Sequence, residues 1–432
     1  MATKGANMIK GYSSTKRGRL MYNIEAALEH LISILVSGSF LATLTKELGI
    51  TDSVTGVLSS IISLGCLFQL FSIFIKRKRY KGFVTIMSVA NQLLFMILYV
   101  IPLSKSSKDV KILFFVISIL SAYLIYYIAH PKKINWFMSN VDDSSRGSFT
   151  AKKEIISLIV GIIFSFIMGF VIDHFMDKGE NRLAFIIAAI VLFILTVSHT
   201  LSVVFTPENT TNCENIEKNS IKNTTKDVFS NKKLLHVVIL FVLYYIATYS
   251  SSPFYGTYQI NELGFSLTFV SFLGMLSSIS RIIVSTFWGR YADKTSFANM
   301  FEKCAIILGL GVFCVVFASP TNGKVMFCLY YIFKGIAMGG INSATINLVF
   351  DYVRPNQRSD SLAVCLAASG SAGFLSTIFA SQLVKYVQYH GLSFFGINIY
   401  AQQLVSFISL LFVIIVILYT RYVIKTFDKK GA

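Results

Sequence analysis

The chain has 432 residues, of which 54% are hydrophobic and only 14% are charged. About a quarter of the residues of a soluble globular domain are charged, so the composition excludes that class. The net charge of +18 is compatible with nucleic-acid binding, but the lysines and arginines gather in alternate short loops between apolar segments. Membrane topology explains this distribution better, so we expect lipid rather than nucleic acid around the chain.

Apolar segments recur along the whole chain, each about 20 or more residues long, which is the length that a helix needs to cross a bilayer. We therefore predict an all-α membrane protein with twelve transmembrane helices. Their predicted bounds are residues 20–47, 51–75, 82–104, 110–139, 150–175, 182–206, 233–258, 265–289, 297–319, 323–352, 358–387 and 398–425.

The basic residues predict the orientation of these helices. The N-terminal segment and the even-numbered loops are rich in lysine and arginine, as in the loop from Lys76 to Lys81, whereas the odd-numbered loops carry few. Cytoplasmic loops are the basic ones, so both termini are predicted to be cytoplasmic. The polar and basic N-terminus does not resemble a cleavable signal peptide. We expect a multi-pass protein of the plasma membrane.

One long polar segment divides the predicted helices six and six. It covers residues 207–232 and is predicted to be a disordered cytoplasmic linker. The predicted domains are thus an N-terminal six-helix bundle (20–206) and a C-terminal six-helix bundle (233–426). Short cytoplasmic tails, 1–19 and 427–432, complete the chain.

The two predicted bundles share a weak internal repeat. Asn135 is followed eleven residues later by Arg146, and Asn347 is followed eleven residues later by Arg358. The same offset of 212 residues also maps the second predicted helix onto the eighth. Internal repeats of this kind are typical of secondary transporters, because two related bundles can move against each other around a central site. The repeat therefore predicts two pseudo-symmetric bundles.

The twelve helices, the six-plus-six division and the sequence "GRYADKTS" (Gly289–Ser296) resemble the major facilitator superfamily. The family's loop after the eighth helix has a glycine, an aspartate four residues later and then a base. Glycine permits a tight helix exit there. The resemblance implies a cytoplasmic gate at Gly289, Arg290, Asp293, Lys294, Arg146 and Arg358. The equivalent first-half loop, "KRKRYK", lacks the glycine and the aspartate, and an ordinary basic loop is the alternative interpretation.

Two carboxylates enter the first predicted helix. Glu25 and Glu29 are four residues apart and lie on one helix face, with Glu29 about 13 Å from the cytoplasmic end. The resemblance implies that the first, fourth, seventh and tenth helices line a central cavity. A carboxylate at this depth needs a partner, water or a proton. One interpretation is that Glu29 (or Glu25) is a proton carrier or cation-binding group. The alternative is that Glu25 lies at the level of the lipid headgroups and Glu29 forms a fixed ion pair with Arg281, Lys132 or Lys133.

Other polar residues of the predicted helices are candidates for a solute site. Lys334, in the tenth helix, either binds an anionic group or extends toward the membrane surface. Asn342, in the same helix, either contacts the solute or holds helices together. Tyr245 and Tyr249, in the seventh helix, either line the cavity or belong to an interfacial aromatic belt.

These patterns predict a secondary active transporter that moves a small solute by alternating access with proton coupling. The alternative is an uncoupled facilitator or exchanger of the same fold, and a membrane sensor or membrane enzyme fits less well. The sequence has no GxxxxGK[ST], HExxH or CxxC pattern, and its six histidines are dispersed. We therefore expect no cofactor, metal or enzymatic activity, and a monomer. The sequence leaves open the solute, the direction of transport and the coupling ion.

Overall fold

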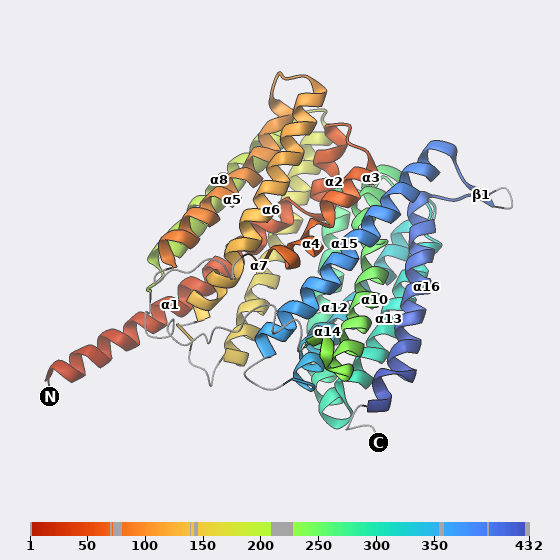
Figure 1. Cartoon of the computed structure of the whole chain (residues 1–432). Coiled ribbons are helices and arrows are strands. Elements are labelled where there is room, and N and C mark those ends of the chain that lie inside the picture. The colour runs from red at the N-terminus through yellow and green to blue at the C-terminus, as the bar shows by residue number, and fades with distance from the viewer. Residues whose placement is uncertain are drawn as a thin grey trace. The chain divides into compact units, whose positions relative to one another are not determined.

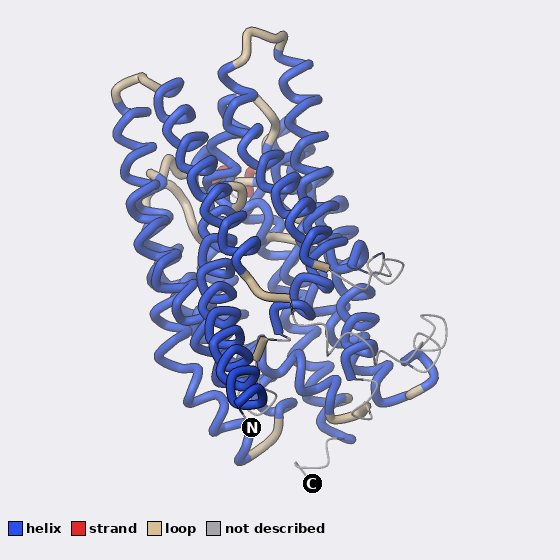
Figure 2. The backbone as a smooth tube through the Cα atoms, turned by 90° about the vertical axis from the view of Figure 1, so that its left-hand side faces the viewer, coloured by secondary structure: helices blue, strands red, loops and turns tan. Residues whose placement is uncertain are grey.

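A computed structural model of the chain describes residues 2–69, 71, 80–138, 140–141, 146–208, 228–353, 358–394 and 397–427. Almost all of this described backbone is helical, and its one regular sheet is a two-stranded antiparallel ribbon of β1 (Ser393–Phe394) and β2 (Ile397–Asn398) (Figure 2). The predicted all-α class is confirmed. Most of the predicted linker, 207–232, lies outside the described residues.

The backbone forms two compact units (Figure 1). Unit 1 consists of Met1–Phe40 and Phe68–Glu217. In it, α1 packs against α7 and α8, and α5 packs against α6 and α8. Its helices are α1 (Ala2–Leu35), α5 (Lys81–Val100), the short 3-10 helix η2 (Ile101–Leu103), α6 (Lys108–Met138), α7 (Arg146–Asp177) and α8 (Asn181–Phe205).

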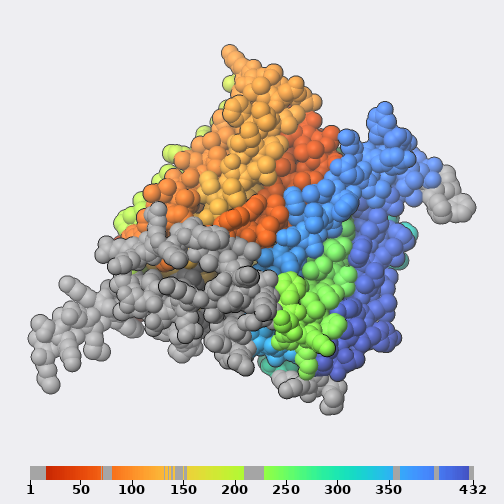
Figure 3. Space-filling model, viewed as in Figure 1, coloured from red at the N-terminus to blue at the C-terminus, as the bar shows by residue number. Residues whose placement is uncertain are grey.

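Unit 2 consists of Leu41–Leu67 and Lys218–Ala432. Its long helices are α10 (Lys232–Tyr249), α12 (Leu267–Lys294), α13 (Phe297–Val316), α14 (Gly323–Phe350), α15 (Arg358–His390) and α16 (Ala401–Tyr422). Its shorter elements are most of α2 (Gly38–Glu47), α3 (Asp52–Ser59), α4 (Ile61–Phe68), η4 (Ser252–Phe254), α11 (Tyr255–Thr257), η5 (Tyr258–Glu262) and η7 (Ile424–Phe427). Figure 3 shows α10 between α15 and α16, and α10 packs against both.

The helices are suited to a bilayer. Ten of those within the described residues are long and apolar enough to cross it, and the bent pair Lys16–Leu35 and Gly38–Glu47 would make eleven. The shorter apolar stretch Asp52–Phe68 occupies the position of the second predicted helix, so the count agrees with the twelve predicted. Large apolar side chains such as Ile283 (70% exposed) and Phe379 (75% exposed) cover outer faces. Lipid is the solvent that such faces require.

The helix starts follow from local capping. Asn231, Ser266 and Ser296 each accept a hydrogen bond from a backbone N–H of the first turn, at the starts of α10, α12 and α13. Such side chains satisfy donors that a helix leaves free at its N-terminus. The predicted starts at 233, 265 and 297 are therefore within two residues of the observed ones.

Several predicted helices are interrupted. The first, 20–47, bends by 40° between α1 and α2, where Gly38 has a φ of +54° that favours glycine. The buried Tyr99 hydroxyl donates to the Leu35 carbonyl, 2.6 Å away, at this break. The seventh predicted helix is broken after Tyr249, because Pro253 has no N–H to continue the ladder. A short π-helix, η5, follows.

The predicted end of the eighth helix at Gly289 is wrong. α12 continues to Lys294, and Gly289 lies within it with no positive φ and with open space where a Cβ would stand. Hydropathy falls where the charged residues begin, but exposed charged residues remain compatible with a helix. The turn is made at Thr295, immediately before the Ser296 cap of α13. The glycine is therefore not a helix exit.

Candidate functional site

Unit 1 contains a buried cluster of ionisable side chains from three helices. Glu25 and Glu29 come from α1, Lys133 from α6 and His199 from α8. The Lys133 ammonium donates to Glu25 Oε1 at 2.8 Å and to Glu29 Oε2 at 2.5 Å. His199 Nε2 lies 3.1 Å from the same Glu25 oxygen. One lysine thus connects both carboxylates, which the four-residue spacing places on one face of α1.

The two carboxylates differ in their access to the surroundings. Glu25 and His199 are each 1% exposed, and Lys133 is 5% exposed, whereas the Glu29 side chain is 25% exposed. Glu25 Oε2 and His199 Nδ1 are buried and have no hydrogen-bond partner among the described residues. Buried polar atoms are nearly always paired, so these two atoms mark a place where a proton or a small ligand can be accommodated.

Charge counting shows what the cluster can do. With both carboxylates ionised, Lys133 protonated and His199 neutral, these four side chains carry a net charge of −1. Lys153 on α7, which donates to the Tyr22 hydroxyl at 3.3 Å, is a further cation that interacts with both carboxylates but forms no ion pair with them among the described residues. Burying an uncompensated charge is unfavourable, so the arrangement favours the uptake of one proton or the approach of one cationic group. Because Glu29 is the more exposed carboxylate, it is the one that can exchange with the outside of the cluster.

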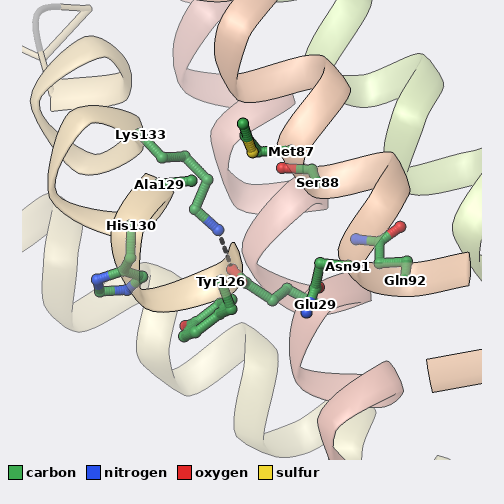
Figure 4. A pocket seen from close by; sticks show the side chains of 9 residues that line it. All are labelled: Glu29, Met87, Ser88, Asn91, Gln92, Tyr126, Ala129, His130 and Lys133. Carbon is green, nitrogen blue, oxygen red and sulfur yellow. Dashed lines mark hydrogen bonds and ion pairs between the residues drawn. The ribbon is translucent and has the colours of Figure 1, made fainter. Parts of the chain in front are cut away.

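A pocket lies beside Glu29 (Figure 4). Its wall is formed by α1, α5 and α6, and its polar residues include Ser88, Asn91, Gln92, Tyr126 and Lys133. The Asn91 amide is fixed, because its Nδ2 donates to the Ala122 carbonyl at 2.8 Å. Gln92 is 3% exposed, and its Oε1 has no hydrogen-bond partner within the described ranges. The volume of the pocket is about 10 Å³, roughly the space of one water molecule, so a solute enters only after the lining side chains move apart.

The cluster also has metal-ligand chemistry. One oxygen of Glu25, one of Glu29 and one nitrogen of His199 lie within 4.8 Å of one another. Nitrogen and oxygen donors at this spacing suit a transition metal. The Lys133 ammonium, however, already contacts both carboxylates and occupies the role of the cation. We therefore treat the cluster as an ion-pair network rather than a metal centre.

The predicted solute-site residues of unit 2 lie on two helices. Tyr245 and Tyr249 on α10 are half-buried, and their rings stack with centroids 5.5 Å apart. Lys334 on α14 is half-buried, with its ammonium 5.7 and 5.5 Å from the ring centroids of Tyr330 and Tyr331. No carboxylate of the described residues forms an ion pair with Lys334, and these two aromatic rings are within the distance of a cation–π contact.

Two other predicted site residues lie on α12 and α14. Arg281 is half-buried on α12, and its carbonyl accepts a hydrogen bond from Ser285. Asn342 on α14 is exposed. Within unit 1 the partner of Glu29 is Lys133, which was one of the predicted alternatives to Arg281.

The predicted gate residues lie at helix ends. Gly289, Arg290, Asp293 and Lys294 are exposed along the last turns of α12. Arg146 and Arg358 begin α7 and α15, and their side chains are outside the described part of the chain. The gating role stays a prediction.

Sequence reasoning missed several residues of the site. His199, Asn91, Gln92 and Tyr126 were not predicted, although each is polar and lies within an otherwise apolar helix. Polar residues at membrane depth are functional candidates by default, which is the signal that could have identified them. Their convergence with Glu25 depends on how α5, α6 and α8 are rotated, which no local pattern specifies.

Comparison with known proteins agrees with the architecture. A curated ribitol transporter of Klebsiella pneumoniae is 22% identical over 293 residues, and the match covers 66% of this chain and 66% of that protein. Two solved structures have a similar fold, each with a TM-score of 0.70. The nucleoside transporter NupG is 14% identical, and the match covers 94% of this chain and 98% of the NupG chain. A D-xylose-proton symporter is 12% identical, and the match covers 97% of this chain and 98% of the symporter chain.

The family model of the Major Facilitator Superfamily matches residues 27–377, which is most of the chain. The relatives are transporters rather than enzymes. Together with the two helical units, these matches show that the chain belongs to the major facilitator superfamily and transports a small solute.

Proposed function

We propose that the chain is a proton-coupled secondary active transporter of a small solute with several hydroxyl groups. It works as a monomer in the plasma membrane, with both termini cytoplasmic, and exposes its solute site to the two sides of the membrane in turn. In this proposal Glu29 carries the proton, and Lys133 is the group that holds Glu29 when the proton is absent.

The observation that carries the proposal is the excess negative charge of the cluster. Two carboxylates share one ammonium, and the more exposed carboxylate faces the pocket. When Glu29 is protonated, Lys133 can pair with Glu25 alone and the net charge becomes zero. Solute in the pocket can then change the position of the Glu29 carboxyl, which links solute binding to proton binding.

The chemistry of the pocket supports an uncharged polar solute. Ser88 and Gln92 supply hydroxyl and amide groups, and the unpartnered Gln92 Oε1 can accept a hydrogen bond from a hydroxyl. The printed names of the relatives, a ribitol, a nucleoside and a D-xylose transporter, all denote solutes with several hydroxyls. In unit 2, Tyr245, Tyr249 and Lys334 are our candidates for further contacts with the solute.

An uncoupled facilitator or exchanger is the second candidate. The observation in its favour is that Lys133 contacts both carboxylates at once, which is also the geometry of a permanent structural ion pair. In that case Glu29 holds α1 against α6 and takes no part in coupling. The two functions differ in whether a pH gradient drives accumulation.

The test is transport by the purified chain in proteoliposomes with radiolabelled ribitol, D-xylose and uridine as probes. We expect a pH gradient to drive accumulation of at least one of them. Glu29→Gln should abolish this accumulation while counterflow exchange continues, because exchange needs the solute site but no net proton movement. The matched control is Glu180→Gln, an exposed glutamate at the start of α8. Unchanged accumulation by Glu29→Gln would refute the proton-carrying role of Glu29. Absence of gradient-driven accumulation by the unaltered chain would leave the facilitator as the better account.

A further inference from the structure

A second buried carboxylate, Asp52, lies in unit 2 and has no basic partner among the described residues. It is the first residue of α3 and is 7% exposed. Three amide groups surround it. Asn261 Nδ2 donates to Asp52 Oδ1 at 2.6 Å, and Gln388 Nε2 and Gln402 Nε2 donate to Asp52 Oδ2 at 3.0 and 3.2 Å. Figure 1 shows α3 beside α15, which carries Gln388.

A second acidic residue belongs to the same cluster. Gln388 Nε2 also lies 3.3 Å from Glu262 Oε1, so one amide serves two carboxylates. Within the described part of unit 2, neither carboxylate forms an ion pair. The cluster therefore has a formal charge of −2 when both are ionised. Buried charges are normally paired or coordinate a metal.

The amide oxygens of this cluster are also uncompensated. Gln402 is fully buried, and its Oε1 has no hydrogen-bond partner in the part of the chain that the structure describes. The Oδ1 atom of Asn261 is likewise buried without a partner. Both oxygens belong to amides whose nitrogens contact Asp52, so they lie next to the carboxylate. Such unpaired buried atoms require an explanation, and a missing ion is one of the recognised explanations.

We propose that these five side chains form a binding site for a hard metal cation of the Ca²⁺ or Na⁺ type. An amide presents its nitrogen or its oxygen with almost the same shape, since a half-turn exchanges the two. Without the ion, the nitrogens satisfy Asp52. With the ion, the amides turn, and the oxygens of Asn261, Gln388 and Gln402 join those of Asp52 and Glu262 around it.

The donor set defines the class of ion. All five side chains offer oxygen ligands. Zinc and copper prefer imidazole or sulfur ligands, and none of the five side chains offers either, so the site does not suit these metals. Ca²⁺ accepts six to eight oxygens in flexible geometry, whereas Mg²⁺ demands a near-ideal octahedron and keeps its water. Two ionised carboxylates match the charge of Ca²⁺. If Glu262 were protonated, the one remaining negative charge, that of Asp52, would match Na⁺. The ion would connect α3 to η5, α15 and α16.

Thermal unfolding of the purified full-length chain tests the proposal. The protein is prepared in choline chloride with a chelator and then titrated with CaCl₂, NaCl, KCl or MgCl₂ at constant ionic strength. We expect a saturable rise of the unfolding midpoint with Ca²⁺ or Na⁺ and none with Mg²⁺, because an ion that binds only the folded state stabilises it. Equilibrium binding of ⁴⁵Ca²⁺ or ²²Na⁺ measures the site directly.

Two variants separate binding from folding. Asp52→Asn should abolish the midpoint shift and the isotope binding. Glu262→Gln, which changes a half-exposed side chain, should still fold and should weaken Ca²⁺ binding at least tenfold. Asp177→Asn, an exposed aspartate in unit 1, is the matched control and should change neither. Absence of saturable cation binding, or binding that persists unchanged in Glu262→Gln, would overturn the proposal. Stabilisation by acid alone would also overturn it, since the site would then hold only protons.

Discussion

Removal of the Lys133 ammonium is the sharpest test of the ion cluster in unit 1. Lys133→Met keeps the length of the side chain but removes the ammonium that pairs with both carboxylates. Glu25 is 1% exposed, so its charge is left in an apolar environment, whereas the Glu29 side chain, at 25% exposed, regains some solvation. Breaking a buried ion pair by removing one partner costs about 3–5 kcal/mol.

This cost can be read from the unfolding temperature. For a unit of this size, 1 kcal/mol corresponds to a change in the midpoint of about 2–4 °C, so we expect Lys133→Met to lower it by roughly 6–20 °C. Intrinsic tryptophan fluorescence suits the assay, because Trp136 lies on α6 in the same unit as Lys133 and is 2% exposed, so its emission changes when this unit unfolds. The neighbouring Lys132→Met is the matched control, since Lys132 is half-buried and lies 5.5 Å from the Tyr80 ring centroid without an ion pair among the described residues.

A double variant separates lost charge pairing from lost packing. Glu25→Gln combined with Lys133→Met removes the buried charge together with its partner, and a buried polar pair replaced on both sides is tolerated far better than one broken on one side. We therefore expect the double variant to recover most of the lost midpoint. The reasoning is refuted if Lys133→Met unfolds within a degree or so of Lys132→Met, or if the double variant unfolds no later than the single one.

Two further predictions concern contacts between helices. Tyr99→Phe leaves the buried Leu35 carbonyl without its donor, and we expect a loss of about 1–3 kcal/mol in the free energy of unfolding, measured by the same midpoint assay. An unchanged midpoint would mean that the break after α1 needs no hydrogen bond from Tyr99. Gly335→Ala would place a Cβ 2.2 Å from the Ser277 carbonyl oxygen, so α12 and α14 must separate at a cost of about 1–3 kcal/mol. Gly274→Ala, which meets nothing within 4 Å, should instead stabilise α12 by up to about 1 kcal/mol, and equal effects of the two alanines would contradict the close contact.

The helical architecture of this chain could be predicted because it depends on local properties. An apolar segment long enough to cross a bilayer must be helical, since no water is present to satisfy its backbone. The starts of α10, α12 and α13 follow from single capping residues, and the break at Pro253 follows from a missing N–H. The sequence also placed Glu25 and Glu29 on one face of one helix.

The composition of the candidate site was decided by tertiary structure. Lys132 and Lys133 are adjacent and chemically identical, yet only Lys133 contacts the two carboxylates, because neighbouring residues of a helix point about 100° apart and packing sets the rotation of α6. His199 reaches Glu25 from a helix more than 170 residues later. The grouping of Asp52 with Gln388 and Gln402 likewise depends on which helices pack together. Patterns of hydropathy and charge depend on residues that are close in the sequence, whereas these contacts join residues that are far apart in it.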